Sequence, residues 1–467
     1  MFENIKLELK AEEKAFLSLD GQSRICNWLY NHLLDTANAL KKQFIETQDL
    51  NLAKIIYSKR GLRNLLPSLK QESNFLKSVH SSPLKNAALR VSLAIQEHQK
   101  GKKGKRKKES GWPRFRSWKQ SWFSLFYDEP NKGWIVEGDL LTLSLGMRCY
   151  LKFHLKEHLI LKDKKIRNMR IVKQNSHYYA VFAIEKKLPE KKQIKKIIAF
   201  DPNHKNMAYG VDCEGNSIEI ASPYWLKKYD KRIDEIKSKR DRCQKKSKKL
   251  LDEKSQKEYF LPSKNWQKYN QTLERVLHKR REQTKVFMFT LSNILCREYD
   301  CIGIGNYTPK GDGISVKMRR SMNNRSLIGR FKEIMAWTTE KSGKFYIEYD
   351  EKDTTRRCSH CGYKIEEGLA PHIRWWECPN CKTEHIRDEN AAQNGLTKVL
   401  RELQEKSETQ VSLVPCSGLD FIKNRWAWRI LPSGVEKHLR GKNSIKLQAP
   451  GNKIESMKAF GQSLSIG

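Results

Sequence analysis

Four cysteines in two close pairs have the spacing that most clearly predicts chemistry. Cys358 and Cys361 form one Cys-x-x-Cys pair, Cys378 and Cys381 form a second, and sixteen residues separate them. Each pair can direct two sulfurs at one tetrahedral ion, as in a zinc ribbon. Because four sulfurs leave no open coordination position, we expect a structural Zn2+ that stabilises a segment too short to form its own core.

Two aspartates that lie far apart in the sequence form a second candidate site. Asp201 ends the apolar run 197–200, which is typical of a buried strand, and Asp388 lies where residues 388–391 open a helix. We expect this helix to bring Asp388 close to Asp201. Carboxylates from distant segments hold the magnesium ions in two-metal phosphodiester hydrolysis. Taken alone, either aspartate is explained as well by a helix N-cap.

The net charge indicates a large polyanionic partner. The 467 residues include 91 Lys and Arg against 53 Asp and Glu, which leaves a formal charge of +38. Self-repulsion of this size favours nucleic acid as the counter-charge over a surface that is merely rich in lysine. A hydrophobic content of 38% argues against a disordered chain.

Three segments concentrate the positive charge. Residues 101–108 form a glycine-broken cationic run, residues 111–116 interleave arginine with aromatic rings, and residues 225–249 predict a cationic helix. Arginine beside planar rings suits contact with phosphates and stacking on bases, although solvated loops and packed aromatics would give similar patterns. The predicted nucleic-acid contacts are Lys102, Lys103, Lys105, Arg106, Lys107, Lys108, Arg114, Arg116, Lys227, Lys228, Arg232, Lys239, Arg240 and Arg242.

The compartment is expected to be reducing. Residues 1–6 lack the apolar core of a secretory signal, no run of 18 apolar residues predicts a membrane span, and seven further cysteines are scattered singly. Scattered cysteines without a secretory signal are typical of reduced thiols. We therefore expect a location in the bacterial cytosol, associated with the nucleoid and not with a membrane.

Helices and strands that would position these groups can be read from hydrophobic periodicity. The first hundred residues show helical spacing, as at Leu84, Ala88, Val91 and Ile95, and residues 134–184 alternate as strands do. A second long helix is expected over about 266–299. These patterns predict a β-barrel-like module with helices appended, followed by a mixed α/β region.

Segment 197–398 resembles the RuvC-type nuclease domain, with its inserted zinc ribbon, of the TnpB family and the miniature type V CRISPR (Cas12-like) effectors. Residues 200–206 around Asp201 resemble the first catalytic motif, residues 387–394 the third, and residues 353–362 the approach to the first zinc knuckle. Similarity at 28–31 and 111–116 is weaker and extends the resemblance over about residues 5–400.

The resemblance implies a multidomain α+β fold. We expect a helical recognition and β-barrel (wedge-like) module over 1–190. An RNase H-type RuvC-like domain would follow over 191–400, with the zinc ribbon at about 354–385. Residues 401–467 lie outside the resemblance, and an aromatic and apolar cluster there predicts either a packed C-terminal cap or a docking surface for a protein partner, such as a second copy or the transcription machinery.

The second catalytic motif departs from the family pattern. The family has a Glu at the end of an apolar strand, but here the matching position is Gly305, and Asn306 follows it. Asp300 lies five residues back, roughly 17 Å along a strand and on its opposite face. Glu298 is further away, and no pattern supports Asp312 as a substitute.

Losing one of three metal-bridging carboxylates typically costs orders of magnitude in rate. We therefore expect Asp201 and Asp388 to be a remnant that binds Mg2+ weakly or not at all, and the protein not to cleave DNA.

The resemblance then implies an RNA-guided DNA-binding protein that holds a guide RNA and a target DNA heteroduplex and acts in transcriptional control. One alternative is an active RNA-guided endonuclease that uses a displaced carboxylate. Another is a guide-free DNA-binding protein of transposon origin.

Overall fold

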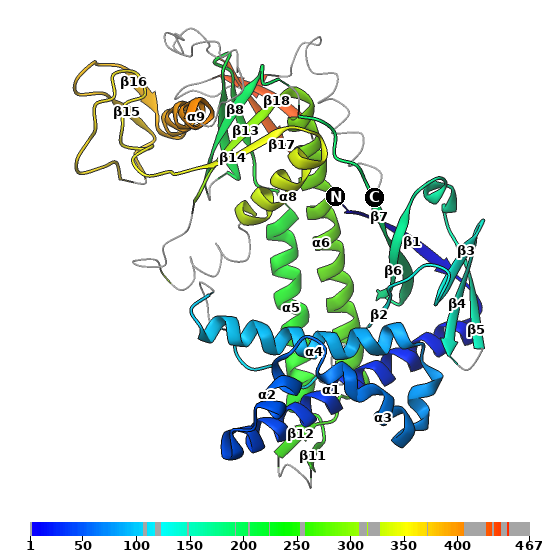
Figure 1. Cartoon of the computed structure of the whole chain (residues 1–467). Coiled ribbons are helices and arrows are strands. Elements are labelled where there is room, and N and C mark those ends of the chain that lie inside the picture. Colours follow the sequence, from blue (N-terminus) through cyan, green and yellow to red (C-terminus); the bar gives the residue numbers. More distant parts are fainter. Residues whose placement is uncertain are drawn as a thin grey trace. The chain divides into compact units, whose positions relative to one another are not determined.

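The chain divides into two compact units, Met1–Lys187 and Leu188–Gly467 (Figure 1). The computed structural model describes the whole chain apart from residues 1, 106–109, 117–122, 147–148, 192, 204–205, 224, 253–256, 308–314, 316–326, 371, 406–425, 432–433, 440–445 and 448–467. Only the backbone is described for 252, 257–260, 426–428, 434–439 and 446–447. None of the helices within the described ranges is long and apolar enough to cross a membrane.

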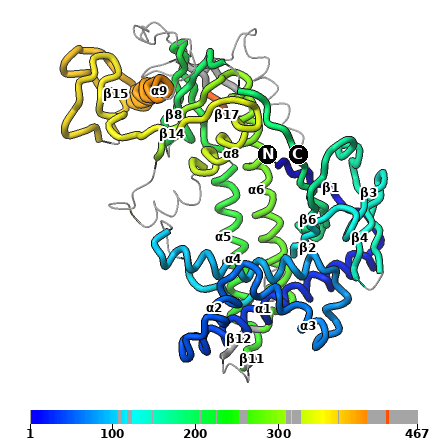
Figure 2. The backbone as a smooth tube through the Cα atoms, viewed as in Figure 1, coloured from blue at the N-terminus to red at the C-terminus, as the bar shows by residue number. Residues whose placement is uncertain are grey.

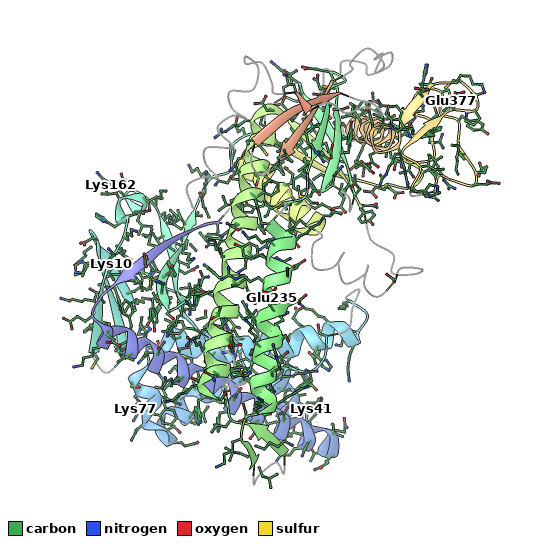
Figure 3. All side chains as sticks on the ribbon, turned by 180° about the vertical axis from the view of Figure 1, so that it is seen from behind. Lys10, Lys41, Lys77, Lys162, Glu235 and Glu377 are labelled. Carbon is green, nitrogen blue, oxygen red and sulfur yellow. The ribbon has the colours of Figure 1, made fainter. Side chains whose placement is uncertain are left out.

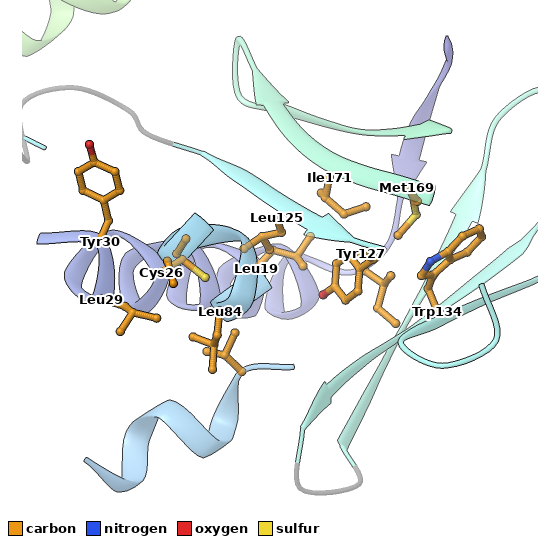
Figure 4. Close-up of a cluster of buried hydrophobic side chains, with 14 of the residues drawn as sticks. Leu19, Cys26, Leu29, Tyr30, Leu84, Leu125, Tyr127, Trp134, Met169 and Ile171 are labelled. Atoms are coloured by element: carbon orange, nitrogen blue, oxygen red, sulfur yellow. The ribbon is translucent and has the colours of Figure 1, made fainter. Parts of the chain in front are cut away.

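Helices make up most of the first hundred residues, as their periodicity predicts. The α-helices are α1 (Glu13–Thr47), α2 (Leu50–Tyr57), α3 (Leu66–Glu72) and α4 (Ser81–Lys102), and the 3-10 helices of this unit are η1 (Leu62–Leu65), η2 (Asn74–Ser78) and η3 (His158–Leu161). Side chains of α1 and α4 pack with the strands in a single core that includes Leu19, Leu84, Leu125 and Ile171 (Figure 4).

The β-module of the first unit is a seven-stranded antiparallel sheet in the order β2-β6-β7-β1-β5-β4-β3. Its strands are β1 (Phe2–Lys10), β2 (Ser124–Tyr127), β3 (Trp134–Glu137), β4 (Leu140–Gly146), β5 (Cys149–Leu155), β6 (Ile166–Gln174) and β7 (His177–Glu185). Helical periodicity did not predict β1. Leu7 and Leu9 are buried while Lys6 and Glu8 are not, and this alternation suits a strand that joins β7 to β5.

The second unit contains an eight-stranded mixed sheet in the order β14-β13-β8-β9-β10-β17-β18-β19. Antiparallel strands β10, β9 and β8 are followed by β13 and β14, which run parallel to β8. This order is that of an RNase H-type, RuvC-like domain. The strands are β8 (Ile197–Pro202), β9 (Ala208–Asp212), β10 (Ser217–Ile220), β13 (Cys301–Gly305), β14 (Phe345–Tyr349), β17 (Trp426–Leu431), β18 (Gly434–Leu439) and β19 (Lys446–Leu447).

Helices cover both faces of this sheet. On one face, α6 (Lys264–Glu298) and α8 (Ile328–Lys341) pack against Ile198, Phe200 and Ile304. On the other, α9 (Arg387–Glu405) packs against Ile197, Ala199 and neighbouring residues of β13 and β14 (Figures 1 and 2). The side chains of β8 therefore alternate between the two cores, as those of a doubly covered strand do.

Three smaller elements complete the second unit. Helix α5 (Trp225–Lys245) pairs with α6 through a small apolar cluster that includes Ile233, Ile236 and Leu273. Strands β11 (Lys249–Asp252) and β12 (Lys257–Phe260) form a hairpin. Strands β15 (Trp375–Glu377) and β16 (Glu384–Ile386) form another, which carries the second cysteine pair between them.

The C-terminal segment adds to the RuvC-like sheet. Strand β17 pairs in parallel with β10, and Ile430 is buried in the same core as Ile218 and Ile220. The predicted cluster around 421–430 lies largely outside the described residues, since Phe421 and the side chains of Trp426 and Trp428 are not described. What is described favours the packed cap over a free docking surface.

Candidate active site and metal centre

The candidate active site lies where three parallel strands end on the α9 side of the sheet. Asp201, near the end of β8, is buried and follows Ile197 and Ala199 on the face that α9 covers. Strand β13 pairs in parallel with β8, with Ile304 opposite Phe200. Gly305, the next residue, is therefore beside Asp201, in the place where the family has its Glu.

Glu351 fills the space that is open beside Gly305. Gly305 pairs with Tyr349 on β14, and Glu351 follows two residues later, on the same side of the chain. A Cβ atom added to Gly305 would lie 2.5 Å from Cγ and 2.6 Å from Cδ of Glu351, with the carboxylate oxygen Oε1 closer still. The carboxylate of Glu351 thus occupies the position toward which a Glu at 305 would project.

Asn306, which follows β13, holds Glu351 in the turn after β14. The backbone N–H of Asn306 donates to the Tyr349 carbonyl (2.8 Å), and the Asn306 side-chain oxygen accepts the Glu351 N–H (3.2 Å). The Glu351 carbonyl in turn accepts the hydroxyl of Thr354 (2.9 Å). Asn306, which replaces an acid common in the family, is therefore a positioning residue for Glu351.

Asp388 completes the cluster from the first turn of α9. Its two carboxylate oxygens lie 3.0 and 3.1 Å from Nη1 of Arg374, which immediately precedes β15. The ribbon thus supplies a positive charge to the same site. Of the acids weighed as substitutes in the sequence, Asp300 lies at the opposite end of β13, where it pairs with Lys344 at 2.6 Å.

Two of these carboxyl groups, those of Asp201 and Glu351, have a raised pKa. Burial raises the pKa of Asp201 well above its usual value, and the nearby charges of Glu351 and Asp388 raise it further. Burial likewise raises the pKa of Glu351 to about 7. Among its nearby groups, the backbone of Tyr307 and the charge of Lys332 oppose this shift.

The site fits a divalent cation. Oε1 of Glu351 is buried and finds no hydrogen-bond partner among the described residues. Carboxylates that are desolvated and close together are unfavourable without a counter-charge. Oxygen ligands are those that Mg2+ prefers. Asp201, Glu351 and Asp388 are therefore the residues that would hold such ions.

A second site is formed by the four predicted cysteines. Their sulfur atoms all lie within 4.8 Å of one another, with Cys358 and Cys381 at 3.7 Å and Cys361 and Cys378 at 3.6 Å. A tetrahedral ion with metal–sulfur bonds of about 2.3 Å would separate its sulfurs by about 3.8 Å. The cysteines can thus hold one structural metal ion.

Neighbouring groups support this cysteine cluster. Nε2 of His385 lies 3.0 Å from the Cys358 sulfur, and Nδ2 of Asn380 lies 3.6 Å from that of Cys361. Hydrogen bonding to Thr383 lowers the pKa of Cys381 to about 6. Such contacts orient the ligands, and the hydrogen bonds to Cys361 and Cys381 favour the thiolate form that binds metal.

Helix α9 connects the two sites. The side-chain amides of Asn390 and Asn394 both donate to the carbonyls of Thr354 and Arg357, at 2.7 to 3.3 Å. Asn390 also accepts the backbone N–H of Ser359, at 2.9 Å. Two residues of the third motif therefore clamp the chain between Glu351 and the first cysteine pair, and contribute no ligand.

The predicted nucleic-acid residues are spread over both units. On α5 the exposed cations are Lys227, Lys228, Arg232, Lys239 and Arg242, whereas Arg240 is half-buried and pairs with Asp241. In the first unit Lys102, Lys103, Lys105 and Arg114 are exposed, as are the labelled Lys10, Lys77 and Lys162 (Figure 3). Arg116 is half-buried, and Arg106, Lys107 and Lys108 lie outside the described residues.

Sequence reasoning missed Glu351, although a signal was present. Ile347 and Tyr349 alternate toward the α9 core, so residue 351 continues that face at the end of the strand. Recognising 345–349 as a strand parallel to 301–305 would have placed Glu351 beside Gly305.

Comparison with known proteins identifies the region that contains the cysteine cluster and part of the candidate active site. Residues 329–394 match the family model described as Cas12f1-like, TNB domain, and they include Glu351, Asp388 and the four cysteines. The predicted relationship to the TnpB and miniature type V lineage is thereby confirmed. No curated protein sequence matches this chain.

Solved structures show weaker similarity. One described as a Cas12f1-sgRNA-target DNA complex has 12% identity, covers 81% of this chain and 82% of its own, and has a TM-score of 0.47. The mini-RNA-guided endonuclease CRISPR-Cas_phi3 has 10% identity, covers 85% and 92%, and has a TM-score of 0.46. The strand order of the second unit, rather than these similarities, defines its RNase H-type fold.

Proposed function

We propose that this TnpB/Cas12-like protein is an RNA-guided DNA endonuclease in which Glu351 replaces the acid missing at Gly305. One observation carries the proposal: the Glu351 carboxylate lies in the space that a Glu at 305 would take, close enough to Asp201 for its charge to raise the Asp201 pKa. We expected a nuclease-dead protein because no substitute carboxylate was found in the sequence. Glu351 is such a carboxylate, so that reason no longer applies. A function in transcriptional control by occupancy alone stays an untested prediction.

Each carboxylate has a distinct place in the proposed chemistry. Asp201 and Glu351 would hold divalent cations at the strand ends, while Asp388 would complete the set from α9. Bound Mg2+ would activate water and stabilise the charge that develops on the scissile phosphate. Burial of Asp201 keeps bulk water from competing for the ligands, and Arg374 neutralises Asp388 when no cation is bound.

The remaining assignments complete the proposal. Zn2+ is the ion that best suits four thiolates at tetrahedral spacing. Guide RNA and target double-stranded DNA are the partners that a charge of +38 and exposed cations on α5 favour. In such a protein base pairing reads the sequence, and the protein contacts the backbone.

Exchange of the carboxylate between strands tests the proposal. The RNA that co-purifies with the full chain is sequenced, and cleavage of a matching target is measured with Mg2+. Glu351→Gln should lower the cleavage rate by orders of magnitude. Gly305→Glu alone should not help, because its Cβ would collide with Glu351. The double variant Gly305→Glu with Glu351→Ala should regain cleavage.

Glu348→Gln is the matched control, since Glu348 lies on β14, is exposed and pairs with Lys332 at 2.5 Å. This variant should cleave like the unmodified protein. An unmodified protein that binds its target without cutting it would overturn the proposal, and so would a Glu351→Gln variant that cuts at the normal rate.

A further inference from the structure

Three arginines from separate elements of the first unit lie close together. Arg90 comes from α4, Arg170 from β6, and Arg116 from the segment before β2. Nη2 of Arg90 donates to Oγ of Ser124 at 2.9 Å, and Nη1 of Arg170 donates to the same oxygen at 3.2 Å. We refer to Arg90, Arg116 and Arg170 as the arginine cluster.

The described contacts of Arg90 and Arg170 are with neutral groups. Besides Ser124, the guanidinium of Arg170 lies over the ring of Phe126, 5.1 Å from its centroid. Within the described part of the chain, no carboxylate lies within ion-pair distance of either arginine. Arg167, three residues from Arg170 on β6, differs because it pairs with Glu185 at 2.6 Å.

Arg116 adds a third charge beside them. Its guanidinium stacks over the ring of Tyr30 at 3.8 Å and donates to Oδ1 of Asn27 at 2.8 Å. Its backbone N–H donates to Oδ1 of Asn31, also at 2.8 Å. These contacts fix the side chain close to Arg90, whose pKa it helps to lower.

Bringing these charges together costs free energy in the absence of a ligand. All three arginines are half-buried, and burial lowers the pKa of Arg90 to about 10, with Arg170 and Arg116 lowering it further. Each guanidinium nevertheless stays charged at pH 7. Partly desolvated like charges destabilise a fold unless an anion compensates them.

We propose that the arginine cluster binds a backbone phosphate of the guide RNA. Arg90 and Arg170 both donate to one oxygen, Oγ of Ser124. A phosphate has two free oxygens and can accept from both guanidinium groups at the same place. The rings of Phe126 and Tyr30 hold the guanidinium groups of Arg170 and Arg116 in place. Contacts of this kind position a nucleic acid without reading its sequence.

The guide RNA is favoured over the DNA because Arg90 and Arg170, half-buried and with neutral groups as their described partners, suit an anion that is bound throughout the protein's working cycle. This inference rests on the proposed function in taking RNA as the resident ligand, but it uses no residue of the cleavage site.

Melting and RNA-binding measurements on the full chain test the site. Arg90→Gln and Arg170→Gln should leave the melting temperature of the RNA-free protein unchanged or higher, because each removes a repelling charge. Each should weaken binding of the co-purifying RNA roughly tenfold to a hundredfold, as loss of a charge-assisted contact does. The slope of log affinity against log salt should fall by about 0.7 for the lost phosphate.

Arg167→Gln is the matched control and should change neither quantity appreciably. Variants at 90 and 170 that melt lower without RNA, yet bind it with normal affinity, would overturn the proposal and make these arginines structural. Weaker binding of DNA but not of RNA would overturn it as well. Loss of cleavage in Glu351→Gln with normal RNA affinity would leave it standing, so the two proposals fail separately.

Discussion

At the scale of single residues, Glu351 is the side chain that supplies a third carboxylate to the candidate active site. Gly305 leaves room at the end of β13, and the side chain of Glu351 enters that room from the neighbouring strand. Its Oε1 is buried with no hydrogen-bond partner in the described part of the chain, and its pKa is raised. Both features are typical of functional groups rather than of structural ion pairs. Asn306 holds the turn that carries it.

The pKa of Glu351 predicts how stability depends on pH when Mg2+ is absent. Its pKa rises from 4.5 to about 7 on folding, so between these values the folded state keeps a proton that the unfolded state has lost. The free energy of unfolding should therefore fall as pH rises from about 4.5 to 7, and then level off. Asp201, whose pKa is also raised, acts in the same direction.

Thermal melting in magnesium-free buffer from pH 5 to 8 measures this effect. Glu351→Gln should flatten the decline, Glu348→Gln should retain it, and added Mg2+ should stabilise the unmodified protein most at pH 8. A stability that rises across this range in the unmodified protein would contradict the assignment.

At the scale of elements, α9 supports both sites at once. Its first turn carries Asp388, its middle packs on Ala199 and Tyr349, and its asparagines hold the approach to the ribbon. Arg374, which belongs to the ribbon, pairs with Asp388 and so brings a positive charge to the candidate active site. One helix therefore joins the cysteine-bearing ribbon to the strands of the candidate active site.

Removing one clamp should loosen this junction. Asn394→Ala leaves the carbonyls of Thr354 and Arg357 with fewer donors, and we expect a loss of about 1–3 kcal/mol in the free energy of unfolding. Denaturant unfolding measures the loss. Thr397→Ala is the control, three residues further along α9. Thr397 is exposed and its described hydrogen bond lies within the helix, so this change should cost less. Equal costs would argue against a clamp.

Removing one sulfur tests the metal centre. Cys361→Ser should release one equivalent of Zn2+ and increase proteolysis around 354–385, because the ion supplies that segment's stability. Cys149→Ser, an exposed cysteine outside the cluster, should keep its metal. Elemental analysis that finds no zinc in the unmodified protein would refute the assignment.

At the scale of the whole molecule, charge rather than shape predicts the partner. The excess of cations is shared by both compact units, with exposed lysines on the first and on α5 of the second. Only a long polyanion can contact so many of them at once. The arginine cluster differs from this diffuse charge because its groups are half-buried, and the described partners of Arg90 and Arg170 are neutral.

Salt should therefore weaken nucleic-acid binding steeply. Each phosphate neutralised on duplex DNA contributes about 0.9 to the slope of log affinity against log salt. We expect a slope of several units for target DNA, measured by fluorescence anisotropy between about 50 and 200 mM salt. An affinity that hardly changes with salt would rule out a backbone-dominated interface.

The sequence by itself determined those features that depend on local spacing. The Cys-x-x-Cys pairs lie close together because each pair is one turn, and Asp201 ends a strand because the apolar run before it requires burial. The cationic helix and the two long helical segments follow from periodicity in the same way. The strand β1 was missed because a short alternation was outweighed by the helices after it.

Only the tertiary structure decided which acid stands beside Asp201. Glu351 reaches Gly305 through the parallel pairing of β13 with β14, whose register aligns Gly305 with Tyr349. That register depends on how α8 and α9 pack on the two faces of the sheet, because a shift of one residue would turn Glu351 to the other face. Contacts between strands so far apart in the chain leave no spacing pattern in the sequence, so the third carboxylate became visible only in the folded protein.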